Sequence, residues 1–255
     1  MFEEEGKETG PKFFSRSIHD HVLNPDLSRR AFVRTAVLAG VGAVSVASIP
    51  QRLNAAQNLE LSAQANKTLR ESGQPAPVLI PEVSIRMRSP DSFLVGVSPA
   101  EVIEIRLADV LKFHGYCAGG VAFSFRAARE AFKILYGDNL PERQNLKVQT
   151  SFHCCQAGAL AYITGARTDF GAIPNKGDLV LIPEEMQKIA FIDKKTGGRA
   201  ILKPLFNPHK IFSPLFQRVR KDHNFSPQVQ ETLNDAVHEY IYGPAKKLFE
   251  VVQER

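Results

Sequence analysis

Residues 146–165, LKVQTSFHCCQAGALAYITG, join an alternating segment to a helical one and place two adjacent cysteines between them. Apolar and polar residues alternate from Leu146 to Phe152, which predicts a half-buried strand. Small and apolar residues then fill 156–164 and Gly165 follows, which predicts a short helix with a glycine stop. Three residues with metal-binding side chains stand at this junction: His153, Cys154 and Cys155.

The third cysteine, Cys117, lies in a similar loop, FHGYCAGG at 113–120. Apolar residues three and four positions apart from Val121 to Tyr136 predict a helix directly after this loop. Cys117 and Cys155 are therefore both expected near helix N-termini, where free amide groups and the helix dipole lower the pKa of a thiol. If the two loops meet in space, they form a thiolate-rich pocket.

A metal ion is the first candidate occupant of that pocket. His114 stands three residues before Cys117, and the glycines of this loop let its backbone wrap closely around an ion. His114, Cys117 and Cys155 would supply two sulfurs and one nitrogen with an open fourth position, the arrangement of a reactive zinc site. Cys154 or His153 would instead close the set at four ligands, which is typical of a structural site. Both arrangements stay open.

Two other interpretations compete with the metal site. In a thiol-disulfide redox protein, Cys117 and either Cys154 or Cys155 would form a reversible disulfide. In an accessory subunit of a metal-dependent oxidoreductase, the C-terminal region would dock a partner. The apolar residues available for such a surface, or for ordinary core packing, are Leu205, Phe206, Phe212, Leu215 and Phe216. The isolated histidines His209, His223 and His238 are expected in surface or core roles.

The remaining elements predict an α+β fold. Strands are expected at 81–88, 178–182, 188–193 and 200–204, with a tight glycine turn between the last two. A helix is expected from Pro99 to about Phe113, because Ser98 to Glu101 has the composition of a capping box. Another helix starts at Ser226 and breaks near Gly243 and Pro244. The predicted core is a small mixed or antiparallel sheet packed with helices, followed by a helical C-terminal extension.

The N-terminal region contains Ser28-Arg29-Arg30-Ala31-Phe32-Val33-Arg34 and then an uncharged run from Thr35 to Pro50. This pattern is typical of a twin-arginine export signal. The run is shorter than the ~20 apolar residues that span a bilayer. We therefore expect export to the periplasm, or otherwise out of the cytoplasm, by twin-arginine translocation of the folded protein; membrane tethering by an uncleaved signal is the alternative.

Composition limits the domain organisation and the partners. The expected parts are a leader and signal at 1–56, a linker at 57–80, a core at 81–205 and the extension at 206–255. The net charge is +5, but basic and acidic residues are interspersed, so no nucleic-acid partner is expected. Three cysteines are too few for a disulfide framework, and their odd number leaves at least one thiol outside any internal disulfide.

These motifs together resemble the FmdE family of formylmethanofuran dehydrogenase subunits over about residues 98–205. The matching features are Phe113-His114-Gly115 with Cys117, the helix containing Arg126-Ala127-Ala128, the strand leading to Cys155, Ile163-Thr164-Gly165, Asp178-Leu179, and the hairpin at 188–205. The resemblance implies an α+β core that forms a homodimer and binds a metal, commonly Zn²⁺, through the histidine and cysteines of these loops.

The resemblance also bears on partners and on the reaction. Members of this family occur as partners of a molybdenum or tungsten dehydrogenase and as free-standing proteins, so an oxidoreductase partner is a further expectation. Tyr116 stands where the family usually has a second histidine, and it is the candidate catalytic residue because its hydroxyl could bond a metal-bound water or a substrate. The predicted function is that of an exported metal-binding protein whose reaction is undefined.

Overall fold

The computed structural model describes residues 64, 67–69, 71–72, 77–151, 154–169, 176–183 and 186–254. His153 and the side chain of Cys154 lie outside this description, as does the range 1–56 with the expected export signal. In chain order the elements are β1 (Ser84–Arg88), α3 (Pro90–Leu94), β2 (Val102–Arg106), α4 (Leu107–His114), α5 (Ala118–Tyr136), η2 (Arg143–Asn145), β3 (Leu146–Ser151), α6 (Cys154–Thr164), β4 (Leu179–Ile182), β5 (Ile189–Asp193), β6 (Arg199–Pro204), α7 (Pro208–Lys221), η5 (His223–Phe225), α8 (Ser226–Tyr242), η6 (Ala245–Lys247) and β7 (Phe249–Glu254).

The described strands form two sheets, and the fold is α+β as predicted. The larger sheet has the order β4-β3-β5-β6-β7, in which β3 and β4 are parallel and the other neighbours are antiparallel. The parallel pair needs a long crossover, and α6 supplies it. The smaller sheet is the antiparallel pair β1 and β2, with Ile85 opposite Ile105.

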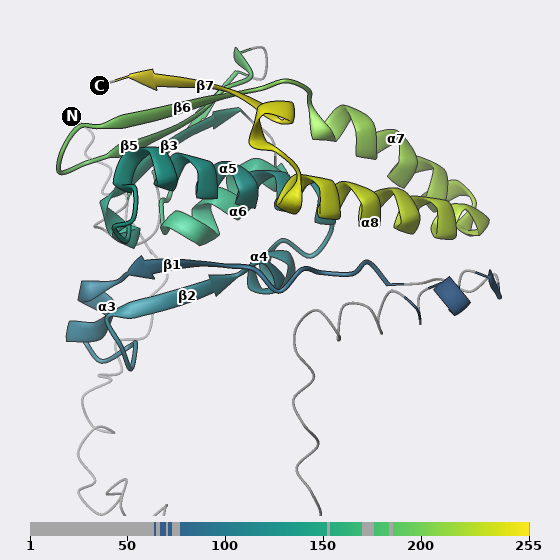
Figure 1. Cartoon of the computed structure of the whole chain (residues 1–255), viewed down its shortest axis with the longest axis horizontal. Coiled ribbons are helices and arrows are strands. Elements are labelled where there is room, and N and C mark those ends of the chain that lie inside the picture. Colours follow the sequence, from purple (N-terminus) through teal and green to yellow (C-terminus); the bar gives the residue numbers. More distant parts are fainter. Residues whose placement is uncertain are drawn as a thin grey trace, which may run out of the picture. The chain divides into compact units, whose positions relative to one another are not determined.

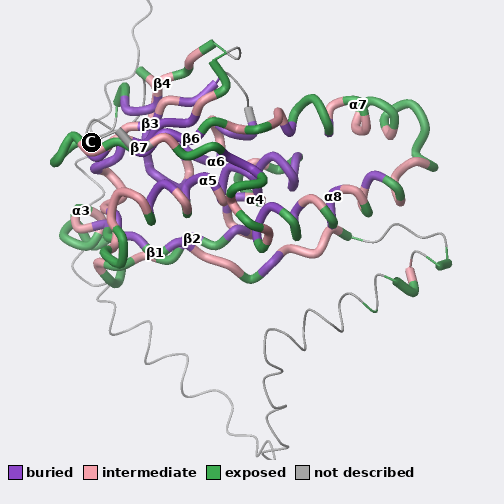
Figure 2. Tube along the Cα trace, turned by 45° about the horizontal axis from the view of Figure 1, so that its top comes forward, coloured by how far each residue is buried: buried purple, intermediate pink, exposed green. Residues whose placement is uncertain are grey.

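Helix α5 is at the centre of the core. It packs against α6, α8 and the strands β5 and β6, and it lies along the larger sheet together with α6 (Figure 1). Most of its residues are buried because it has neighbours on several sides, and a helix in that position is expected to be apolar around most of its circumference. Figure 2 shows the contrast between this buried helix and α7, which is largely exposed.

The predicted helix from Pro99 to Phe113 is wrong in its first half. Residues 102–106 form β2, and α4 begins only at Leu107. The segment V-I-E-I-R alternates, so as a strand it buries Ile105 against the core while pairing with β1. The side chain of Asp109 caps α4 by accepting a hydrogen bond from the N–H of Arg106 at 3.2 Å.

Most of the other predicted elements are confirmed within a few residues. The strands β1, β3 and β4, the β5–β6 hairpin, the helices α5 and α6, and the end of α8 at Gly243 lie where the sequence placed them. Helix α7 lies in the expected helical extension, although its bounds were not predicted, and strand β7 was not predicted. β7 pairs with β6 at one edge of the larger sheet, so the last residues of the chain return to the core. No helix in the described residues is long and apolar enough to cross a membrane.

Candidate thiol and metal site

Cys117 lies between two helices, at the point where the chain turns from α4 into α5. Gly115 ends α4 with φ of +75°, a conformation that favours glycine, and its N–H bonds to the carbonyl of Leu111 at 2.7 Å. Cys117 is the N-cap of α5, and its sulfur accepts a hydrogen bond from the N–H of Gly120 at 3.3 Å. The thiol therefore occupies the position that the sequence predicted, at the positive end of a long helix.

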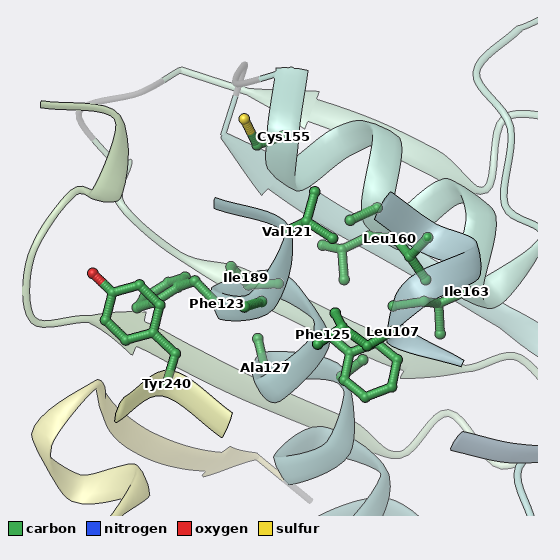
Figure 3. Close-up of a cluster of buried hydrophobic side chains, with 14 of the residues drawn as sticks. Leu107, Val121, Phe123, Phe125, Ala127, Cys155, Leu160, Ile163, Ile189 and Tyr240 are labelled. Carbon is green, nitrogen blue, oxygen red and sulfur yellow. The ribbon is translucent and has the colours of Figure 1, made fainter. Parts of the chain in front are cut away.

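Cys155 reaches the same place from the first turn of α6. A Cβ atom built on Gly120 would lie 2.8 Å from Cys155 Cβ, 3.0 Å from Cys155 Sγ and 3.2 Å from Cys117 Sγ. Both thiol side chains therefore contact the bare backbone of one glycine, and they approach each other because that glycine has no side chain. Figure 3 shows Cys155 at one end of the buried apolar cluster, beyond Val121.

The two thiols interact directly. Cys117 is 4% exposed and Cys155 is 3% exposed, and neither is in a disulfide. The pKa of the Cys117 thiol lies below its ordinary value, chiefly because the Cys155 thiol donates a hydrogen bond to it. Burial opposes this effect, and the N–H groups of Gly120 and Gly119 add to it. Cys117 is therefore the better thiolate of the pair.

His114 lies against α6 at Gly158, one helical turn beyond Cys155. Its Nδ1 atom is 3.8 Å from the position that a Cβ on Gly158 would take, and Gly158 follows Cys155 by three residues. Its Nε2 atom is buried and has no hydrogen-bond partner among the described residues. Burial lowers the pKa of this imidazole, which favours the neutral form that binds metals.

The described residues thus bring two of the predicted ligands, Cys117 and Cys155, together and place the third, His114, against the next turn of α6. They contain no group of three His, Cys, Asp or Glu side chains close enough to hold a metal ion. The donor chemistry nevertheless suits zinc, since two buried thiols and a neutral imidazole with an unpartnered nitrogen are typical zinc ligands. Cys154 adjoins Cys155 in α6, and no side-chain position is described for it or for His153.

Helix α7 packs over the thiols and borders a partly open cavity of about 190 Å³. The lining residues are Tyr116, Cys117, Cys155, His209, Phe212, Ser213, Phe216, Gln217 and Arg220. The ring of Phe212 is 1% exposed and packs directly on Gly119, where any Cβ would overlap it. The two glycines therefore allow two different close contacts. The missing side chain of Gly119 leaves room for Phe212 of α7, and that of Gly120 leaves room for Cys155 of α6.

Tyr116 and Arg220 form the outer wall of the cavity. Tyr116 is 53% exposed, and its ring centroid is 4.8 Å from that of Phe216. Its hydroxyl oxygen accepts a hydrogen bond from Nη2 of Arg220 at 2.9 Å. The tyrosine is thus close to the thiols, as a candidate substrate-binding residue should be, and α7 holds it in place.

Sequence reasoning missed the contribution of α7 to this site. His209 was expected in a surface or core role and Phe212 in a docking surface or the core, and Arg220 was not singled out. His209 is exposed but lines the cavity, and Phe212 is a core residue. The sequence did contain a signal for the start of α7. Asn207 is its N-cap and Pro208 its first helical residue, and both residue types are common at these positions.

The comparisons with known proteins agree with the motifs. The family model described as "FmdE, Molybdenum formylmethanofuran dehydrogenase operon" matches residues 113–250. This match includes both thiol loops, α7 and α8. A crystal structure of a tungsten formylmethanofuran dehydrogenase FmdE-like protein from Syntrophus aciditrophicus is similar, with 17% identity over 59% of this chain and 73% of that one and a TM-score of 0.36. No curated protein matches this chain significantly.

Proposed function

Since this chain belongs to the FmdE family, whose members are related to formylmethanofuran dehydrogenase, we propose that it is a metal-binding protein in which Cys117 and Cys155 hold Zn²⁺ or a similar divalent transition ion. The observation that carries this proposal is the approach of the two buried thiols across Gly120. Two sulfur ligands favour zinc over magnesium or calcium, which prefer oxygen.

His114 is the proposed third ligand. Its unpartnered Nε2 and its place one turn from Cys155 support this role, although the three side chains do not form a ready cluster in the described residues. His153 and Cys154 are the proposed alternatives for a fourth ligand. A bound zinc ion would supply Lewis-acid activation of a carbonyl or of water, while Tyr116 and Arg220 would orient a molecule in the cavity.

Elemental analysis tests this proposal. The purified wild type should contain about one metal ion per chain, and Cys117→Ser and Cys155→Ser should each bind the ion at least about tenfold more weakly, since a thiolate ligand is lost. His223→Ala is the matched control, because His223 lies in η5 and does not line the cavity. Unchanged metal content in both cysteine variants would exclude these residues as ligands.

A thiol redox function is the second candidate, and the direct hydrogen bond between Cys155 and Cys117 favours it. Oxidation would form one S–S bond and release two protons and two electrons, which an oxidised disulfide of a partner protein accepts by thiol exchange. Thiol counting separates the two functions. A metal protein exposes its thiols only after a chelator is added, whereas a redox protein loses two thiols reversibly in oxidised glutathione and contains no metal.

We also propose that the protein is exported by the twin-arginine route, on the sequence evidence of Ser28 to Arg34. Replacing Arg29 and Arg30 with lysine keeps the charge and removes the arginine pair that the export machinery recognises. The wild type should then be found in the periplasmic fraction of a bacterial host, or at its membrane if the signal is not cleaved, and the double variant in the cytoplasm. Equal export of the wild type and the double variant would refute the proposal that this segment is a twin-arginine signal.

We also propose that the chain forms a homodimer and acts beside an oxidoreductase partner, as the resemblance to the FmdE family implies. Light scattering of the purified chain measures the first property directly. A mass equal to two chains is expected, and a monomer at all concentrations would contradict it.

A further inference from the structure

The cavity under α7 has an apolar body. The rings of Phe212, Phe216 and Tyr116 line it together with the two thiols, and its volume is about 190 Å³. An apolar cavity of roughly 150 Å³ is large enough to bind benzene. The space between α7 and the thiols therefore suits a group of six or so carbon atoms rather than a nucleotide or a peptide.

The rim of the cavity carries an unbalanced positive charge. Arg220 is the one lysine or arginine among the lining residues, and no aspartate or glutamate lines the cavity in the part of the chain that the structure describes. In that same part, no carboxylate forms an ion pair with Arg220. Arg126, in contrast, forms an ion pair with Glu130.

Tyr116 holds this charge in place without neutralising it. One N–H of the guanidinium donates to the tyrosine hydroxyl at 2.9 Å, and the guanidinium carbon is 5.4 Å from the ring centroid. An arginine has five N–H donors, so several remain for an anion. The tyrosine O–H can also donate, and the side chains of Ser213 and Gln217 add polar atoms to the lining.

We propose that this cavity binds a small monocarboxylate with an aryl or short apolar body. The carboxylate would bond to Arg220 and Tyr116, and the apolar body would lie between Phe212 and Phe216 with its far end toward Cys117 and Cys155. The inference deepens the proposed function, because it rests on that metal site sharing the two thiols with this cavity. A phosphate is excluded as the favoured ligand, since a single arginine over an apolar lining would balance its charge poorly.

Calorimetric titration of the full-length protein, incubated with zinc beforehand, tests the inference with three probes. Benzoate should bind, and benzamide, its neutral counterpart of the same shape, should bind about tenfold more weakly or worse because it lacks the charge that Arg220 recognises. Inorganic phosphate should not compete. Equal affinities for benzoate and benzamide, or competition by phosphate, would overturn the proposal.

Two variants locate the binding. Arg220→Met should weaken benzoate binding about tenfold or more, since it removes a charge-assisted hydrogen bond. Lys221→Met removes the same charge from the next residue, which is exposed and does not line the cavity, so it should leave the affinity unchanged. Equal losses in both variants would mean that only the net charge matters, which contradicts the proposal.

Metal analysis of the same samples separates this inference from the metal site. Full zinc content without benzoate binding would refute the monocarboxylate and leave the metal proposal standing. Benzoate binding by protein that takes up no zinc would refute the metal proposal and leave the carboxylate site standing.

Discussion

Gly120 controls how closely the two thiols approach. An alanine there would put a methyl group 2.8 Å from Cys155 Cβ, and real Cβ atoms do not come so close to a neighbour. We predict that Gly120→Ala lowers the free energy of unfolding by about 1–3 kcal/mol, the usual cost of overpacking. It should also lower zinc content, because Cys155 must move. Urea unfolding and elemental analysis measure the two effects.

Gly158→Ala is the matched control for this prediction. Gly158 is also a helical glycine, but a Cβ on it would meet only His114 Nδ1, at the ordinary contact distance of 3.8 Å. Alanine should therefore be neutral or stabilise the protein by up to ~1 kcal/mol, because glycine is the poorer helix former. A loss of stability in Gly158→Ala as large as that in Gly120→Ala would show that the thiol contact is not the cause.

At the level of single residues, the sequence predicted the positions of the two cysteines better than it predicted which residues surround them. Cys117 and Cys155 each stand at a helix start, which is a local signal, and the structure brings them together as expected. Arg220 carries no such signal. Its place beside Tyr116 depends on α7 packing over the start of α5, a contact between residues far apart in the chain.

Among the elements, α7 has one large buried side chain, that of Phe212. Phe212 is 1% exposed and lies against Gly119, whereas its neighbour Ile211 is 43% exposed. We predict that Phe212→Ala destabilises the protein by about 3–5 kcal/mol, the range for a buried phenylalanine. It should also expose the thiols to alkylating reagents.

Ile211→Ala is the control, and it should change stability by less than about 0.5–1 kcal/mol because the site is exposed. Urea unfolding and the rate of thiol modification compare the two variants. Similar behaviour of both variants would mean that α7 does not cover the thiols in solution.

The turn between β5 and β6 depends on Asp193. Its Oδ1 atom accepts hydrogen bonds from the N–H groups of Lys195 and Thr196, both at 2.8 Å. Asp193→Ala should therefore cost about 1.5–3 kcal/mol, as for hydrogen bonds to a charged group. Asp193→Asn should cost less, because the amide oxygen can still accept both bonds.

The same carboxylate predicts a dependence on acid pH. Burial alone would raise the pKa of Asp193, but the N–H of Thr196, the side chains of Tyr136 and Asn145 and the N–H of Lys195 together outweigh it, and the pKa lies below its ordinary value. The stabilisation is therefore complete above the unfolded pKa of about 3.9 and is lost as the pH falls through the lower folded value. Unfolding curves across this range should show a smaller acid loss in Asp193→Asn than in the wild type, and equal losses would contradict this role.

The elements that the sequence misassigned are those that depend on distant partners. Ser98 to Glu101 has good capping residues, yet the segment after it forms β2 because Ile105 gains burial opposite Ile85. Residues 249–254 form strand β7 by pairing with β6. β-propensity largely reflects such neighbours, so local composition could not decide either case.

In the molecule as a whole, the site lies where four helices meet. The last residue of α4, the first turns of α5 and α6, and the inner face of α7 contribute its residues. The N-terminal ends of α5 and α6 both carry a cysteine, and their dipoles stabilise negative sulfur. The α+β class was predictable because each element has its own periodicity, but the packing of α7 and α8 over the core was not. The domain boundaries remain a prediction.

X-ray absorption at the zinc edge, on the purified full-length protein, tests the central claim most directly because it counts the ligands of the metal. We predict two sulfur ligands at about 2.3 Å together with at least one nitrogen at about 2.0–2.1 Å. One sulfur should disappear in Cys117→Ser and one in Cys155→Ser. A metal bound only by nitrogen and oxygen, or a sulfur count that neither substitution changes, would contradict the account.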